Sequence, residues 1–169
     1  MNYLYKDMEY SKIVSHIMEN KEFLKIDNCR HHGITRLEHS LRVSYFSYKI
    51  SKKLKLNANE TAVAGLLHDF FTNDELTTKE HRFSAFTHPK KCLKNADYHF
   101  ELSDMQKDII FSHMFPLIPT RPPKYLESWV VSMVDKVVAI YEFVKSYHKL
   151  YFFKLENVAI AMTIILAKI

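Results

Sequence analysis

Residues 64–71, with the sequence Ala-Gly-Leu-Leu-His-Asp-Phe-Phe, place an imidazole beside a carboxylate at the end of an apolar run. In a helix, His68 shares a stripe with Thr61, Ala64 and Gly65, and Asp69 lies on the adjoining stripe, so both polar groups point into packed protein. A buried carboxylate is unfavourable unless it is paired, and a cation held jointly by His68 and Asp69 satisfies both groups. The small residues one turn earlier allow a second helix to approach closely and to bring further ligands.

Other histidines and acids have inward positions on separate predicted helices. His39 heads a stripe that continues through Val43, Phe46 and Ile50, and Asp135 lies among valines and an alanine on a later helix. A single histidine on an apolar face is more often a hydrogen-bonded core residue than a ligand. Several such residues on different helices favour one shared site instead. The complete candidate set is His39, His68, Asp69, His88, His113 and Asp135.

Apolar periodicity and capping signals predict the helices that position this set. The first helix covers residues 7–20 and is followed by a polar connector that ends in the turn at residues 31–33. Thr35 caps a helix that ends near Leu54, with Glu38 as the reciprocal partner in a capping box. The helix of residues 60–71 carries the His-Asp pair.

The second half of the chain is predicted to continue in helices. Residues 72–87 are expected to form a loop, and a helix begins at residues 87–89, with His88 just before a proline. Ser103 and Gln106 form a capping box for the helix that leads to His113. Residues 115–125, with four prolines, form a stiffened loop before a helix of residues 126–150 that carries Asp135. The uncharged run at residues 157–167 is expected to be a buried or dimer-forming helix.

Length and composition favour one helical domain. The chain has 169 residues, of which 47% are hydrophobic and 25% charged, with two glycines and five prolines. So few glycines argue against a glycine-rich phosphate loop and against a strand-and-turn fold. The formal charge of +5 and pI of 9.1 suit attraction of anionic small molecules, because no block of like charges indicates nucleic acid.

The same composition sets the expected cellular location. Cys29 and Cys92 are isolated and form no zinc or dithiol motif, which favours a reducing compartment. The first residues mix charges with tyrosines and do not resemble a signal peptide, and no apolar run reaches the ~20 residues of a membrane span. We therefore expect a cytoplasmic protein without a membrane partner.

In the order of its His, His-Asp doublet and distant Asp, the chain resembles the HD-domain metal-dependent phosphohydrolase superfamily. His39, His68, Asp69 and Asp135 stand in that order, and the alanine, glycine and two leucines before the doublet strengthen the match. The resemblance implies an all-α, single-domain helical bundle of about six or seven helices. The domain would cover residues 1–169, with a core at about 36–142 and packing helices at both ends.

Two further histidines before the last Asp are typical of the two-metal branches of this superfamily, and His88 and His113 match them. The branch that the chain resembles most includes the bacterial symmetrical diadenosine-polyphosphate hydrolases. The resemblance implies that His39, His68, Asp69 and Asp135 hold one metal, that Asp69 bridges, and that His88 and His113 hold the second. Mixed imidazole and carboxylate ligands suit Fe, Mn, Zn, Ni or Co.

The chain departs from these relatives beside the doublet. Many two-metal relatives carry a Gly and then a Lys where this chain has Phe71 and Thr72. The acidic pair of alarmone hydrolases and the Gly-Tyr-Pro signature of the cyclic-dinucleotide branch are also absent. Arg36 and Lys136, each close to a predicted ligand in the sequence, are the replacement candidates for binding phosphate. Arg42, Arg121 and Lys124 are interpreted as solvated surface charges.

These features predict hydrolysis of a phosphate ester or anhydride in a nucleotide. Asp69 and two divalent metals would generate the attacking hydroxide, and Lys136 and Arg36 would stabilise phosphate charge. The alternatives are a non-catalytic protein of the same fold that binds metal or nucleotide, and a di-iron oxygenase. A basic nucleic-acid binder ranks last, and a homodimer is left open.

Overall fold

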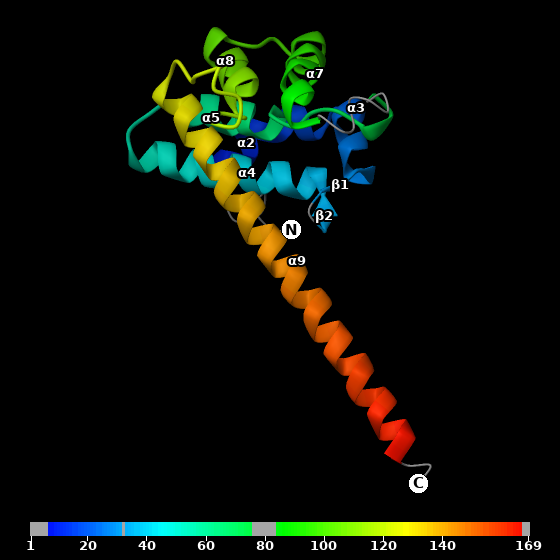
Figure 1. The fold of residues 1–169 in the computed structure, drawn as a ribbon. Coiled ribbons are helices and arrows are strands. Elements are labelled where there is room, and N and C mark those ends of the chain that lie inside the picture. Colours follow the sequence, from blue (N-terminus) through cyan, green and yellow to red (C-terminus); the bar gives the residue numbers. More distant parts are fainter. Residues whose placement is uncertain (1–6, 32, 76–83, 167–169) are drawn as a thin grey trace.

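The computed structural model describes residues 7–31, 33–75 and 84–166, and it describes side chains for 7–30, 33–74 and 86–148. The described part contains seven α-helices and one two-stranded antiparallel ribbon (Figure 1), so the prediction of an all-α fold is confirmed. None of the described helices combines the length and apolar character that crossing a lipid bilayer requires. The elements are α2 (Met8–Met18), α3 (Lys21–Leu24), the 3-10 turn η1 (Lys25–Asn28), β1 (Arg30–His31), β2 (Ile34–Thr35), α4 (Arg36–Lys53), α5 (Ala58–Leu67), the 3-10 turn η2 (Asn73–Glu75), α7 (Ser84–His99), α8 (Asp104–Ser112) and α9 (Leu126–Leu166).

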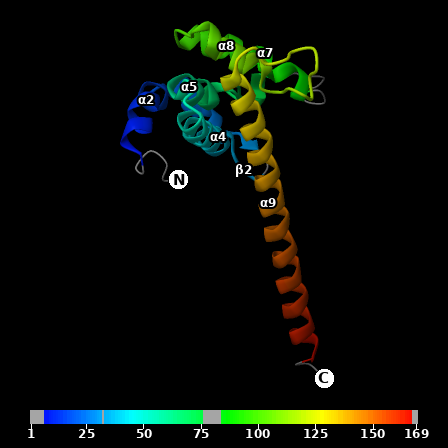
Figure 2. The ribbon, with the colours of Figure 1, turned by 90° about the vertical axis from the view of Figure 1, so that its left-hand side faces the viewer.

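Helix α5 is the centre of the bundle. Every residue from Thr61 to Phe71 is buried, because this apolar helix contacts α2, α4, α8 and α9. Figures 1 and 2 show α4 beside α5, with α7 and α8 grouped on one side of this pair. The chain leaves α5 at His68, so the His-Asp pair emerges where the surrounding helices converge.

Gly65 sets the distance between α4 and α5. A Cβ atom at this position would lie 3.1 Å from the backbone Cα of Ser44, which is closer than packed carbons tolerate without movement. Ser44 also donates a hydrogen bond to the carbonyl of Ala62 (2.6 Å) and accepts one from the Tyr10 hydroxyl (2.9 Å). Three helices are therefore tied together one turn before His68, as the small residues there predicted.

Replacing Gly65 with valine should destabilise the protein. The branched side chain meets backbone atoms of α4, and overpacking of this kind typically costs about 1–3 kcal/mol. Gly65→Ala should show a smaller loss, since one methyl group needs only a small shift. Urea unfolding of both variants measures the difference, and a valine variant as stable as the parent would disprove the close contact.

Side-chain caps fix the start of the helices that carry the candidate residues. The Thr35 hydroxyl accepts a hydrogen bond from the Glu38 backbone N–H (3.2 Å), which confirms the predicted cap of α4. The Glu38 carboxylate accepts a hydrogen bond from Arg42 (3.1 Å), one turn further along the helix. At α8 the predicted capping box of Ser103 and Gln106 is complete.

Several predicted boundaries differ from the structure. The polar connector contains α3, η1 and the β1–β2 ribbon, because Asn20 caps a short turn that buries Phe23 and Ile26. Phe46 and Ile50 are 42% and 41% exposed, because the buried face of α4 beyond Val43 continues through Ser44, Ser47 and Ser51 instead. The apolar pattern does not reveal this face, because small polar residues form it.

Helix α7 begins at Ser84, and Pro89 lies inside it, so the helix start predicted at residues 87–89 is wrong. Residues 73–75 of the predicted loop form η2, and residues 76–83 lie outside the described residues. Helix α5 ends at Leu67, so His68 and Asp69 follow the helix and do not lie within it.

Helix α9 is longer than the prediction of residues 126–150. It continues to Leu166, and Figures 1 and 2 show its C-terminal half projecting away from the bundle. The loop of residues 115–125 precedes it, as expected. The uncharged run from residue 157 up to 166 is the far end of this helix, and what it packs against stays a prediction.

Candidate metal centre

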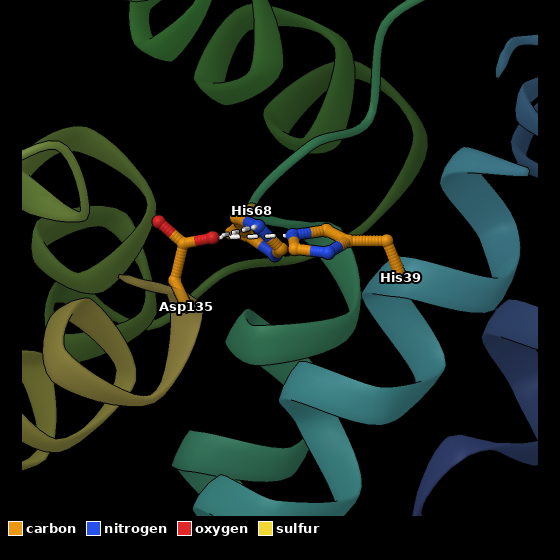
Figure 3. A group of neighbouring side chains, drawn as sticks. All are labelled: His39, His68 and Asp135. Atoms are coloured by element: carbon orange, nitrogen blue, oxygen red, sulfur yellow. Dashed lines mark hydrogen bonds and ion pairs between the residues drawn. The ribbon is translucent and has the colours of Figure 1, made fainter. Parts of the chain in front are cut away.

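The six candidate residues come together as two groups of three. His39, His68 and Asp135 form the first triad, in which the potential ligand atoms all lie within 4.8 Å of one another. One oxygen of Asp135 is 3.1 Å from Nε2 of His39 and 3.6 Å from Nε2 of His68 (Figure 3). Three helices supply these groups, namely α4, the end of α5, and α9.

Asp69, His88 and His113 form the second triad. Nε2 of His88 lies 3.3 Å from an Asp69 oxygen and 2.8 Å from Nε2 of His113. The two triads adjoin, because the rings of His68 and His113 meet edge to face with centroids 5.0 Å apart. All six side chains are buried.

His68 and His113 are held in the same way at the ends of two helices. Each follows the last residue of its helix, α5 or α8, and its Nδ1 donates to the carbonyl three residues earlier, at 2.8 Å for Gly65 and 2.7 Å for Ile110. A carbonyl only accepts hydrogen bonds, so Nδ1 carries the proton and Nε2 is left to act as a ligand. The negative ends of both helix dipoles also favour a cation there.

Glu142 is a site residue that the sequence interpretation missed. One of its oxygens accepts a hydrogen bond from Nδ1 of His39 at 2.8 Å, and the other accepts one from Arg42. A carboxylate behind a metal-binding histidine fixes the tautomer and the orientation of the ring. The available signal was its position on the buried stripe of α9, two turns after Asp135.

The donor set fits a bound cation. Nε2 of His68 is buried without a hydrogen-bond partner, which is unfavourable unless another ligand occupies its lone pair. Nε2 of His88 and Nε2 of His113 converge to 2.8 Å, with an Asp69 oxygen 3.3 Å from the former, so three potential ligand atoms face one another. Neutral imidazoles with carboxylates are ligands for divalent transition metals.

The electrostatics of the triads differ. Burial opposes charge on His39, but hydrogen bonds with Asp135 and Glu142 raise its pKa to about 10. Burial also opposes ionisation of Asp135, whereas its hydrogen bond with His39 holds its pKa well below the usual value. Burial, and then the neighbouring His88 and His68, hold the pKa of His113 well below its usual value. A metal bound in the first triad would therefore have to displace the proton that lies between His39 and Asp135.

This raised pKa predicts how the stability of the metal-free protein depends on pH. The folded pKa of about 10 exceeds the ordinary value of 6.5, so the folded state binds more protons than the unfolded state between these values. The contribution of His39 is complete below pH 6.5 and is lost as pH rises toward about 10. Urea unfolding in a chelator at several pH values should show this decline, and His39→Gln should flatten it. Equal slopes in both proteins would contradict the assignment.

The two basic candidates lie beside the triads but in different settings. Arg36 is buried, with Nε 3.7 Å from an Asp69 oxygen, and it donates to the Phe71 carbonyl (2.6 Å) and to Asn73 (3.3 Å). Its guanidinium also stacks on the Phe71 ring, 3.8 Å from the centroid. Lys136 is partly exposed and donates to Asp135 (3.2 Å) and to the backbone carbonyl of His113. Lys136 thus contacts one residue of each triad.

The division of ligands differs in one respect from the resemblance. Asp69 is grouped with His88 and His113, whereas the resemblance also assigns it to the first metal as a bridge. Its position next to His68 at the junction of the triads is compatible with both roles. The bridging role of Asp69 stays a prediction.

Comparison with protein families agrees with this geometry. A family model described as HD domain matches residues 36–140, which is more than half of the chain. The chain therefore belongs to the HD-domain family, whose members are typically metal-dependent hydrolases. No match was found among curated proteins or among solved structures.

Proposed function

We propose that this protein is a metal-dependent phosphohydrolase that cleaves a phosphate ester or anhydride in a nucleotide. The observation that carries the proposal is the pair of adjoining triads, His39, His68 and Asp135 beside Asp69, His88 and His113. Membership of the HD-domain family supports the same reaction class. A more specific proposal is that the protein is similar to the symmetrical diadenosine-polyphosphate hydrolases. It rests on the order of the histidines in the sequence.

Each triad would hold one divalent ion, of Fe, Mn, Zn, Ni or Co. Two such ions, when bound, lower the pKa of a shared water and neutralise charge on the phosphoryl oxygens. Asp69 contributes a carboxylate at the junction of the triads, where it can accept a proton or hold the attacking water. Arg36 lies behind Asp69, with Nε 3.7 Å from an Asp69 oxygen, where its positive charge can orient this carboxylate.

Lys136 is the better of the two candidates for contact with substrate. Its ammonium group is partly exposed at the edge of both triads, whereas the guanidinium of Arg36 is buried and contacts Phe71, Asn73 and Asp69. A phosphate would need to draw Lys136 away from the His113 carbonyl or to share its protons. We therefore assign Arg36 to positioning and Lys136 to phosphate binding.

A hydrolysis panel tests this proposal. The protein is reconstituted with Mn²⁺ or Fe²⁺ and is offered nucleoside mono-, di- and triphosphates and dinucleoside polyphosphates, with release of phosphate or nucleotide measured. Turnover of at least one compound is expected, and it should stop with chelator and in Asp135→Ala. No turnover of any compound by protein with both ions bound would contradict the hydrolase assignment.

A second candidate function is metal-dependent nucleotide binding without hydrolysis. The observation that favours it is the replacement of the usual Lys by Thr72, together with the engagement of Arg36 with other groups. Calorimetry would then show metal-dependent binding of a nucleotide that is recovered intact. A di-iron oxygenase would instead need oxygen for turnover. Repeating the panel under argon distinguishes the two, because a hydrolase keeps its activity there and an oxygenase loses it.

A further inference from the structure

Helix α9 has an apolar face on the side that points away from the bundle. One side of the helix contacts the core through residues such as Val131, Asp135 and Val138. The opposite side carries large hydrophobic residues that are 42–66% exposed. They are Leu126, Trp129, Met133, Val137, Ile140, Tyr141, Val144 and Tyr147. A helix that is apolar on both sides is typically covered on both sides.

The spacing of this outer stripe is that of a helix-pairing seam. Alternating steps of four and three residues lead from Leu126 through half-buried Val130, Met133, Val137, Ile140 and Val144 to Tyr147. Trp129 and Tyr141 flank this line. Apolar residues at this repeat allow two helices to pack along their length. In the sequence, the same steps continue to Tyr151, Lys154, Val158, Ala161 and Ile165, so the apolar repeat is interrupted by one charge and one small residue. These positions lie in the part of α9 that projects from the bundle (Figure 2).

A groove beside the stripe enlarges the apolar surface. It lies between α4 and α9 and is lined by Phe46 and Ile50 on one side and by Met133, Val137 and Tyr141 on the other. Both α4 residues are exposed although they are large and apolar. Because the groove and the outer stripe share α9 residues, they form one continuous surface.

The size of this surface matches one half of a stable protein interface. Four aromatic side chains at on the order of 200 Å² each and six aliphatic ones at roughly 100 Å² each, all about half exposed, amount to roughly 700 Å². Standard interfaces bury about 800 Å² on each partner, and apolar patches on monomers rarely exceed ~600 Å². The partner must bring a long apolar helix face of its own. Helix α9 of a second copy carries such a face. In a two-fold symmetric dimer, the outer stripe of one copy would pack against the same stripe of the other.

We propose that two copies of this chain associate through the outer stripe of α9 and the adjoining groove, so that the protein is a homodimer. The proposal does not depend on the chemistry of the triads. It explains why large hydrophobic residues occupy the solvent-facing side of a helix that projects from its own bundle. It also gives a role to Phe46 and Ile50, which do not contribute to the core.

Light scattering coupled to gel filtration tests the association at tens of micromolar protein. The full chain should elute with about twice its mass of 20.1 kDa. The double variant Val137→Glu, Ile140→Glu places charges at two positions that are 62% and 64% exposed, so it should remain helical by circular dichroism and elute as a monomer. Ile140→Ser alone should weaken the dimer at least tenfold.

The control is Tyr98→Glu on α7, at a position that is 84% exposed but far from the stripe in the sequence and on another helix. It should remain dimeric. A parent chain that is monomeric at this concentration would overturn the proposal. A double variant that remains dimeric would also overturn it, because the contact would then lie elsewhere.

Discussion

Asp69→Ala is expected to abolish hydrolysis and to remove the metal from the second triad. The carboxylate is the charged member of the group with His88 and His113, and its loss leaves two imidazoles that cannot balance a divalent charge. Because metal binding adds to folding stability, the melting temperature in the presence of metal should fall as well. Buried Arg36 also loses its acidic neighbour, which adds to the loss.

Two variants separate the charge of Asp69 from its volume. Asp69→Asn keeps the shape of the side chain but removes the charge, so it should lose metal and activity with a smaller effect on the metal-free fold. The control is Asp97→Ala, which removes an exposed carboxylate that pairs with Lys107 at 2.8 Å. Its metal content and its activity should both equal those of the parent. Elemental analysis and an activity assay on the three variants give the result. Full metal occupancy in Asp69→Ala would show that Asp69 is not a ligand.

Glu142→Gln is the second change with a large expected effect. The amide can still contact His39, but it no longer draws the Nδ1 proton toward a carboxylate, so the ring becomes a weaker ligand. Loss of such a partner typically weakens metal binding 10–100-fold. Glu142→Ala should in addition destabilise the fold by about 3–5 kcal/mol, since His39 and Arg42 then lose a buried partner.

Glu127 provides the matched control for Glu142. It is also a buried carboxylate of α9, and its side chain accepts a hydrogen bond from the Asn57 backbone (2.9 Å), away from both triads. Glu127→Gln should reduce stability without changing metal affinity. Competition with a coloured chelator measures affinity in both variants. Equal affinities for Glu142→Gln and the parent would exclude a positioning role for Glu142.

Much of this arrangement could be predicted from the sequence because the signals are local. The apolar run before His68, the caps at Thr35 and Ser103, and the buried face around Asp135 each depend on neighbouring residues. Helix α5 is apolar on every side over residues 62–67, and such a segment must also lie at the centre. The family signature then indicated that candidate ligands far apart in the chain belong to one site.

Other features depend on contacts between distant segments, which periodicity does not contain. The start of α7 was placed too late because proline is typical of a first turn, whereas Pro89 lies five residues after the first residue of this helix. Phe46 and Ile50 follow the stripe of His39 in the sequence, but the buried face of α4 runs through serines instead and leaves the two residues 42% and 41% exposed. Glu142 had no motif to mark it, since its role is set by the crossing of α4 and α9.

We infer that the two triads hold two divalent metals, one in each. Elemental analysis of protein purified without chelator, and without a metal-binding affinity tag, measures this directly. We expect about two ions per chain in the parent and about one in His88→Ala, which leaves the first triad intact. One ion in the parent would assign the second triad to another role. No metal even after reconstitution would contradict the claim, because the six residues would then be a buried polar network.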